Sequence, residues 1–121
     1  ERNTLICDSY NANPSSMSKA LGAFSEISAE KKLVILGDML ELGHESLPEH
    51  SRIIETLDAM EGTEVVLVGP VFISLAKGKT IKTFSSSGEA REWLSKENLS
   101  GYTVLVKGSR GMMLEKVYDV L

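Results

Sequence analysis

The sequence predicts an α/β domain, a three-layer α/β/α sandwich around a mostly parallel, Rossmann-like sheet of five or six strands. Apolar runs of four to six residues alternate with longer segments whose apolar residues recur every three or four positions, as in β-α-β units. Most of the short runs are continuously apolar, which is typical of strands covered on both faces. A chain of 121 residues with 42% hydrophobic content fits one domain with its own core.

The elements follow in order along the chain. The expected strands are the five short apolar runs, at residues 4–8, 33–37, 65–69, 81–84 and 103–107. Between them lie three helical stripes that would cover the sheet: Met17, Ala20, Leu21, Phe24 and Ile27; Ile53, Ile54, Leu57 and Met60; and Ala90, Trp93 and Leu94. Asn13 and Pro14 are a favourable helix start, Ser87 is the expected cap of the third helix, and residues 112–121 form an expected last helix.

Charge and composition exclude several classes of protein. The 13 Lys and Arg against 17 Asp and Glu give a net charge of −4 without a long basic run, so nucleic acid is not expected as a partner. The longest nearly apolar stretch, residues 65–73, is about half the ~20 residues that span a bilayer, so no membrane association is expected. The single Cys7, expected to be buried, forms no internal disulfide, which indicates a reducing, cytoplasmic location. Because the chain starts without Met, we expect a piece of a longer protein.

The first candidate loop, residues 8–14, follows the first expected strand. In an open parallel sheet, ligands bind outside the carboxyl ends of the strands. Asp8 is suited to accept hydrogen bonds from a ribose or to hold a metal-bound water, while Tyr10 and Asn11 offer an aromatic face and amide edges to a base. The alternative is that Asp8 and Asn13 only organise a turn and a helix cap. The loop contains no glycine, so it is not a dinucleotide-binding turn.

The second candidate loop, residues 37–43, follows the second strand. Gly37 and Gly43 would allow positive φ at its ends. Asp38 and Glu41 are candidates for function, but we favour a role in bracing the loop. His50 is interpreted as an ordinary surface or half-buried histidine. No second His or Cys lies at metal-binding spacing, so no metal site is expected.

The third candidate loop, residues 107–111, places two cations and a hydroxyl between two glycines at an expected helix start. Backbone N–H groups and positive charge favour an anion there, a carboxylate or a phosphate. The alternative is a solvated basic turn. The chain contains no P-loop, Gly-x-Ser-x-Gly elbow, Cys-His pair or carboxylate dyad. We therefore expect a ligand-contacting domain without catalytic residues of its own.

Three segments, at residues 8–17, 36–43 and 104–112 with Glu115 and Lys116, resemble the C-terminal domain of the Mur ligase family. The resemblance covers essentially the whole chain, residues 1–121 as one domain. The first motif is shared with the wider Mur ligase and folylpolyglutamate synthetase group. The second and third resemble the branch that adds D-alanyl-D-alanine to UDP-N-acetylmuramoyl-tripeptide in peptidoglycan synthesis, the cell-wall pathway that supports cell shape and division.

This resemblance implies an ATP-dependent, amide-bond-forming ligase. In the family, a central domain absent from this chain carries the P-loop and the Mg²⁺ ligands, ATP forms an acyl phosphate, and the dipeptide amine attacks it. The C-terminal domain closes over the central one, so the chain alone is expected to be inactive. The resemblance implies nucleotide contacts from Asp8, Tyr10, Asn11, Asn13 and Pro14. It implies dipeptide contacts from Lys107, Gly108, Ser109 and Arg110, with Arg110 or Lys107 on the terminal carboxylate.

Other interpretations compete with this one. Another ligase of the same group would share the first motif. A signalling receiver domain would share an acid after the first strand and a lysine after the last, which Asp8 and Lys107 fit. Its phosphoacceptor aspartate would end the third strand, however, where this chain has Val68, Gly69 and Pro70. A noncatalytic binding module would tolerate changes at Lys107 and Arg110.

Overall fold

The computed structural model describes residues 2–8 and 12–121. Five strands form one sheet in the order β1-β5-β2-β3-β4, and every neighbouring pair is parallel, which confirms the predicted fold class. The elements are β1 (Thr4–Asp8), α1 (Pro14–Ser25), β2 (Lys32–Gly37), η1 (Gly43–Glu45), α2 (Ser46–Asp58), β3 (Thr63–Val68), α3 (Pro70–Leu75), β4 (Lys82–Phe84), α4 (Ser87–Glu97), β5 (Thr103–Lys107), η2 (Arg110–Met112) and η3 (Leu114–Val120), where η marks a 3-10 helix.

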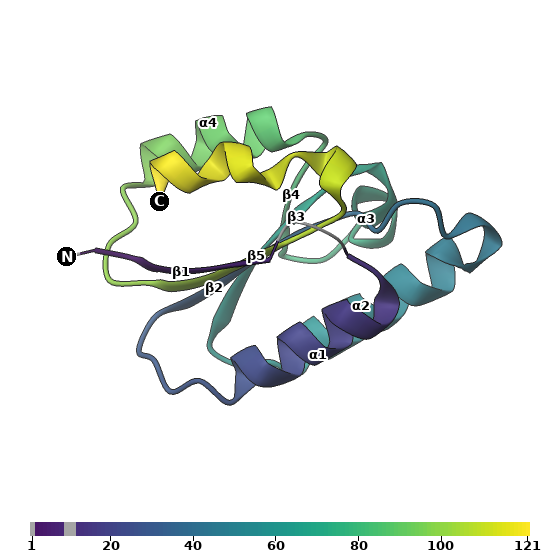
Figure 1. The fold of residues 1–121 in the computed structure, drawn as a ribbon, viewed down its shortest axis with the longest axis horizontal. Helices are drawn as coiled ribbons and strands as arrows, with labels where there is room; N and C mark the ends of the chain where they lie inside the picture. The colour runs from purple at the N-terminus through teal and green to yellow at the C-terminus, as the bar shows by residue number, and fades with distance from the viewer. Residues whose placement is uncertain (1, 9–11) are drawn as a thin grey trace.

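Helices cover both faces of the sheet (Figure 1). Helices α1, α2 and α3 pack on one face, and α4 and η3 pack on the other. Strand β2 shows how the faces divide, because its successive side chains alternate between the two cores. Val34 and Leu36 join the first core, while Leu33 and Ile35 join the second. All four are buried, as expected for a strand in the middle of a three-layer fold.

Helix α1 is held at both ends. Asn13 Oδ1 accepts the backbone N–H of Ser16, and Ser16 Oγ accepts the N–H of Asn13, which confirms the predicted helix start. At the other end, Lys32 Nζ donates to the carbonyl oxygens of Phe24 and Ile27 at 2.8 and 2.9 Å. Lys32, from β2, therefore adds a charged donor at the carboxyl end of α1, where the Phe24 carbonyl oxygen also accepts the N–H of Ile27.

Several local predictions are wrong. Residues 112–121 do not form an α-helix: Met113 has φ +55° and separates two 3-10 helices. Ser86, not Ser87, caps α4, and its side chain accepts the N–H of Glu89. Gly37 does not adopt positive φ, although Gly43 does. A Cβ at Gly37 would lie 3.2 Å from side-chain atoms of Met112 and Leu114, so close packing is the reason for this glycine.

Strand β1 departs from the expectation of full burial. It lies at the edge of the sheet, and Cys7 is exposed rather than buried. An edge strand has a neighbour on one side only, so an apolar run there does not guarantee burial. Within residues 2–8 and 12–121, no helix has the length and apolar content needed to cross a bilayer.

Candidate functional site

The carboxyl ends of all five parallel strands lie at one edge of the sheet, and the candidate loops leave from that edge. Strand β5 lies between β1 and β2, so Lys107 is in register with Asp8 on one side and Leu36 on the other. The first and third predicted loops therefore start from adjacent strands. Tyr10 and Asn11 lie outside the described residues, and Asp8 is placed by its backbone at the end of β1.

Ser109 connects three segments at this edge. Its Oγ accepts the N–H of Leu40 at 2.8 Å and lies 3.5 Å from the carbonyl oxygen of Ala12, to which it donates. Its own N–H donates to the carbonyl oxygen of Asp38 at 3.3 Å. Ser109 is buried. Its hydroxyl group therefore forms its hydrogen bonds within the protein, and it connects the end of the first loop with the start of the second.

The two cations of the third loop differ sharply in exposure. Lys107 is 1% exposed at the end of β5, whereas Arg110, the first residue of η2, is exposed. Gly108 lies between them, and a Cβ there would approach the Cα of Gly37 to 2.9 Å. A Cβ at Gly111 would lie 2.8 Å from Leu40 Cδ1. The loop is therefore packed tightly against residues 37–40, not a solvated turn, and Arg110 is the cation that it presents at the surface.

Asp38 braces the second loop, as predicted. Its carboxylate oxygens accept the N–H groups of Val71 and Phe72 at 2.9 and 3.0 Å, at the start of α3. A negative charge is favoured at a helix N-terminus. Gly69 has φ +128°, and a Cβ there would lie 2.3 Å from Asp38 Cγ. The turn from β3 into α3 therefore requires glycine, because the carboxylate occupies the space of any side chain.

His50 is fully buried, which corrects the prediction of a surface or half-buried residue. Its Nδ1 lies 2.7 Å from the carbonyl oxygen of Ser46 and donates to it, while Nε2 accepts the N–H of Met39 at 2.9 Å. Asp38 Oδ1 is 3.9 Å from Nε2. Since Nε2 accepts a hydrogen bond, the imidazole is neutral and this contact is not an ion pair.

The sequence did carry a signal for the burial of His50. Position 50 precedes the apolar stripe of 53, 54 and 57 at helical spacing, which places it on the buried face of α2. No comparable signal existed for the contact between Asp38 and α3, because the two lie 33 and 34 residues apart.

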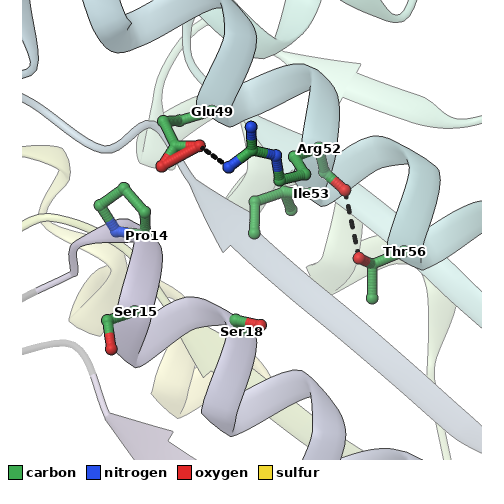
Figure 2. Close-up of a pocket in the computed structure, with 7 residues that line it drawn as sticks. All are labelled: Pro14, Ser15, Ser18, Glu49, Arg52, Ile53 and Thr56. Atoms are coloured by element: carbon green, nitrogen blue, oxygen red, sulfur yellow. Dashed lines mark hydrogen bonds and ion pairs between the residues drawn. The ribbon is translucent and has the colours of Figure 1, made fainter.

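A groove runs between α1 and α2 (Figure 2). Its volume is about 240 Å³, and Arg52 Nη1 pairs with Glu49 Oε1 across 2.7 Å on its α2 side. Pockets that enclose a small ligand span roughly 300–1,000 Å³, so this groove has room for only part of a nucleotide. Of the predicted nucleotide residues, Pro14 lines it. The lining residues are Pro14, Ser15 and Ser18 from α1 and Glu49, Arg52, Ile53 and Thr56 from α2.

Residues 2–8 and 12–121 hold no cluster of three or more His, Cys, Asp or Glu side chains suited to a metal ion. Mg²⁺ is commonly held by one or two carboxylates together with substrate phosphates, so what the described residues lack is a complete metal site of their own.

Comparisons with known proteins agree with this architecture. The chain is 35% identical to UDP-N-acetylmuramoyl-tripeptide–D-alanyl-D-alanine ligases of Treponema pallidum (98% of this chain) and Escherichia coli (100%), and spans 27% of each relative's length. It resembles crystal structures of MurF ligase from Thermotoga maritima in complex with ADP (TM-score 0.76, 26% identity, 99% of this chain, 28% of that chain) and of MurF from Acinetobacter baumannii (TM-score 0.80, 26%, 98%, 28%).

The match is not confined to single relatives. The family described as Mur ligase, glutamate ligase domain, matches residues 1–110, which include all five strands, the first loop and the third loop as far as Arg110. The chain therefore belongs to the Mur ligase, glutamate ligase domain family.

Proposed function

We propose that residues 1–121 are the C-terminal domain of a cytoplasmic ligase that joins D-alanyl-D-alanine to UDP-N-acetylmuramoyl-tripeptide in peptidoglycan synthesis, at the expense of ATP. Relatives that carry this activity in their names match the chain over nearly its whole length. The chain spans about a quarter of their length, so the other domains would supply the phosphate-binding loop, the Mg²⁺ ligands and the tripeptide site. The single cysteine supports the cytoplasmic location.

One observation carries the proposal: two loops with different chemistry leave adjacent strands at one edge and are connected through Ser109. A rigid domain built this way can hold a nucleotide on the β1 side and a dipeptide on the β5 side. When it closes over the central domain, the dipeptide amine is brought to the acyl phosphate, and the reaction gains from orientation and from exclusion of water. The groove beside Pro14 has room for only part of a nucleotide, which supports a nucleotide site that the central domain would complete on closure.

Exposure separates the proposed roles in the third loop. Arg110 is exposed, and a guanidinium binds a carboxylate with two parallel hydrogen bonds, so we assign it the terminal carboxylate of the dipeptide. Lys107 is buried beside Asp8 in the sheet register and contributes positive charge beneath the loop, with Gly108 and Ser109 shaping it. In the first loop, Asp8, Tyr10, Asn11 and Pro14 are proposed to contact the nucleotide, while Asn13 is engaged in capping α1.

The test is ligase turnover of the full-length protein with Asp8→Ala and Arg110→Ala, at varied ATP and dipeptide concentrations. Loss of a hydrogen bond to a charged group costs roughly 1.5–3 kcal/mol, so Arg110→Ala should raise the KM for the dipeptide by about ten- to a hundredfold and leave that for ATP unchanged. Asp8→Ala should raise the KM for ATP instead. Arg91→Ala is the matched control, since Arg91 is paired with Asp119 and lies on α4.

If neither variant changes turnover, the domain is a noncatalytic cover and the site assignment fails. The isolated chain should show no turnover at all. Measurable activity would contradict the proposal that the other domains supply the phosphate-binding loop and the Mg²⁺ ligands.

The strand order argues against the receiver-like alternative. In the flavodoxin-like order 2-1-3-4-5, the first strand lies inside the sheet. Here β1 is at the edge and β5 lies next to it, and β3 ends at Val68 without an aspartate. Incubation with a small phosphodonor should therefore leave the intact mass unchanged.

A further inference from the structure

His50 is a buried, neutral histidine that the proposed reaction does not use. Both of its ring nitrogens are engaged, with Nδ1 donating to Ser46 and Nε2 accepting from Met39. The ring also meets Phe72 edge-on, with 4.7 Å between the ring centroids. An apolar side chain would fill this place in the core equally well. What histidine adds is an acceptor for a backbone N–H that would otherwise be buried without a partner.

The Met39 N–H that His50 accepts belongs to a short segment connected to the third loop. Leu40, the next residue, donates its N–H to Ser109 Oγ, and the carbonyl oxygen of Asp38 accepts the N–H of Ser109. Leu40 also packs so close to Gly111 that a Cβ there would lie 2.8 Å from Leu40 Cδ1. Residues 38–40 are therefore fixed by His50 on one side and lie against residues 109–111 on the other.

We propose that His50 is a positioning residue: by holding segment 38–40, it sets where the loop around Arg110 lies and so tunes binding of the carboxylate-bearing dipeptide. The inference rests on the proposed function, which assigns the dipeptide to Arg110. His50 itself is fully buried and acts only through the segment and Ser109.

The experiment compares three variants of the full-length protein. His50→Phe keeps an aromatic ring in the core but removes the acceptor for the Met39 N–H. His50→Gln is the conservative variant, because its amide oxygen can replace Nε2 as an acceptor. His44→Gln is the matched control, since the His44 side chain is 95% exposed in the same region. Readouts are the KM for dipeptide and for ATP, kcat, and hydrogen exchange at the amides of Met39 and Leu40.

We expect His50→Phe to raise the KM for the dipeptide by about fivefold to thirtyfold, the effect of losing one buried hydrogen bond, and to leave kcat and the KM for ATP unchanged. Exchange at Met39 and Leu40 should become faster. His50→Gln should recover most of both effects, and His44→Gln should match wild type. If His50 only stabilised the fold, His50→Phe would not raise the KM for the dipeptide while leaving the KM for ATP unchanged, and His50→Gln would not restore the dipeptide KM.

Three results would overturn the inference: an unchanged dipeptide KM in His50→Phe, equal changes in both KM values, or no recovery in His50→Gln. If His50→Phe does not fold, Ser109→Ala tests the other end of the segment, and slower or unchanged exchange at Leu40 would then overturn it. If wild type shows no ligase turnover, the proposed function fails on its own, while faster exchange in His50→Phe still supports the positioning contact.

Discussion

Helices α1 and α3 both begin with a proline after a strand, yet they are stabilised in different ways. Asn13 and Ser16 cap α1 from within its own first turn. Helix α3 has only Gly69 at its cap position, and its first N–H groups are satisfied by Asp38, at the end of another strand. The start of α1 is therefore local structure, whereas α3 depends on the pairing of β2 with β3. Because Asp38 also lies in the second loop, α3 and that loop form one cooperative unit.

The largest expected effect is at Gly69. A Gly69→Ala side chain would collide with the Asp38 carboxylate, and the residue would have to keep φ +128°. We expect a loss of about 3 kcal/mol in the free energy of unfolding, measured in urea. Gly22→Ala in α1 is the control, because apart from its chain neighbours and the adjacent helix backbone no heavy atom lies within 4 Å of its Cβ position. That change should stabilise the protein by about 1 kcal/mol. Equal losses at both glycines would contradict the comparison.

Asp38→Ala should be the next most severe change. It leaves the N–H groups of Val71 and Phe72 without their acceptor, at an expected cost of about 2 kcal/mol. Combining it with Gly69→Ala sharpens the test, because the alanine then no longer meets a carboxylate. The double variant should lose clearly less than the sum of the single variants. Additive losses would show that strain at Gly69, not contact with Asp38, dominates.

Asn13→Ala should have a smaller, local effect. Removal of an asparagine cap costs about 1 kcal/mol, and the first turn of α1 should exchange its amide hydrogens faster while α3 stays unchanged. Asn13→Asp should keep most of the stability, since a carboxylate accepts the same Ser16 N–H. If Asn13→Ala also loosened α3, the two helix starts would not be independent.

The smallest expected effect concerns a third helix start, that of α4. Hydrogen bonds from the Ser85 side chain and N–H hold the pKa of Glu89 below its usual value of 4.5. A lowered folded-state pKa means that the stabilisation is fully present above pH 4.5 and is lost as the pH falls through the folded pKa. Melting temperatures of wild type and Glu89→Gln should therefore differ slightly at neutral pH and converge in acid. A difference that grows in acid would refute this.

The sequence was sufficient for elements that rest on local pattern. The continuous apolar runs predicted β1 and β5 with the observed bounds, and the other strands to within two residues. The last helix was not predictable, because Met113 adopts positive φ and divides residues 110–120 into two 3-10 helices. The order of the strands was not predictable either, since it depends on contacts between residues far apart in sequence.

In the candidate site, too, the residue types were predictable from the sequence, but their burial and long-range contacts were not. Residue types predicted an anion-binding loop at 107–111, but not that Lys107 is buried while Arg110 is exposed. Nor could spacing show that the Ser109 hydroxyl connects Leu40 with Ala12. These features arise where β5 is inserted between β1 and β2. Tyr10 and Asn11 lie outside the described residues, so their contacts with nucleotide stay predictions.

The placement of β5 also bears on how the chain folds during its synthesis. Among the described residues, β1 pairs with β5 and with no other strand, and Thr4 is in register with Thr103. Of these five strands, a ribosome makes β1 before the others and β5 after them, so β1 leaves the exit tunnel long before its neighbour exists. Pairing over such a separation in sequence slows folding. We therefore expect the unpaired β1 to be the segment most dependent on chaperone protection until β5 has been made.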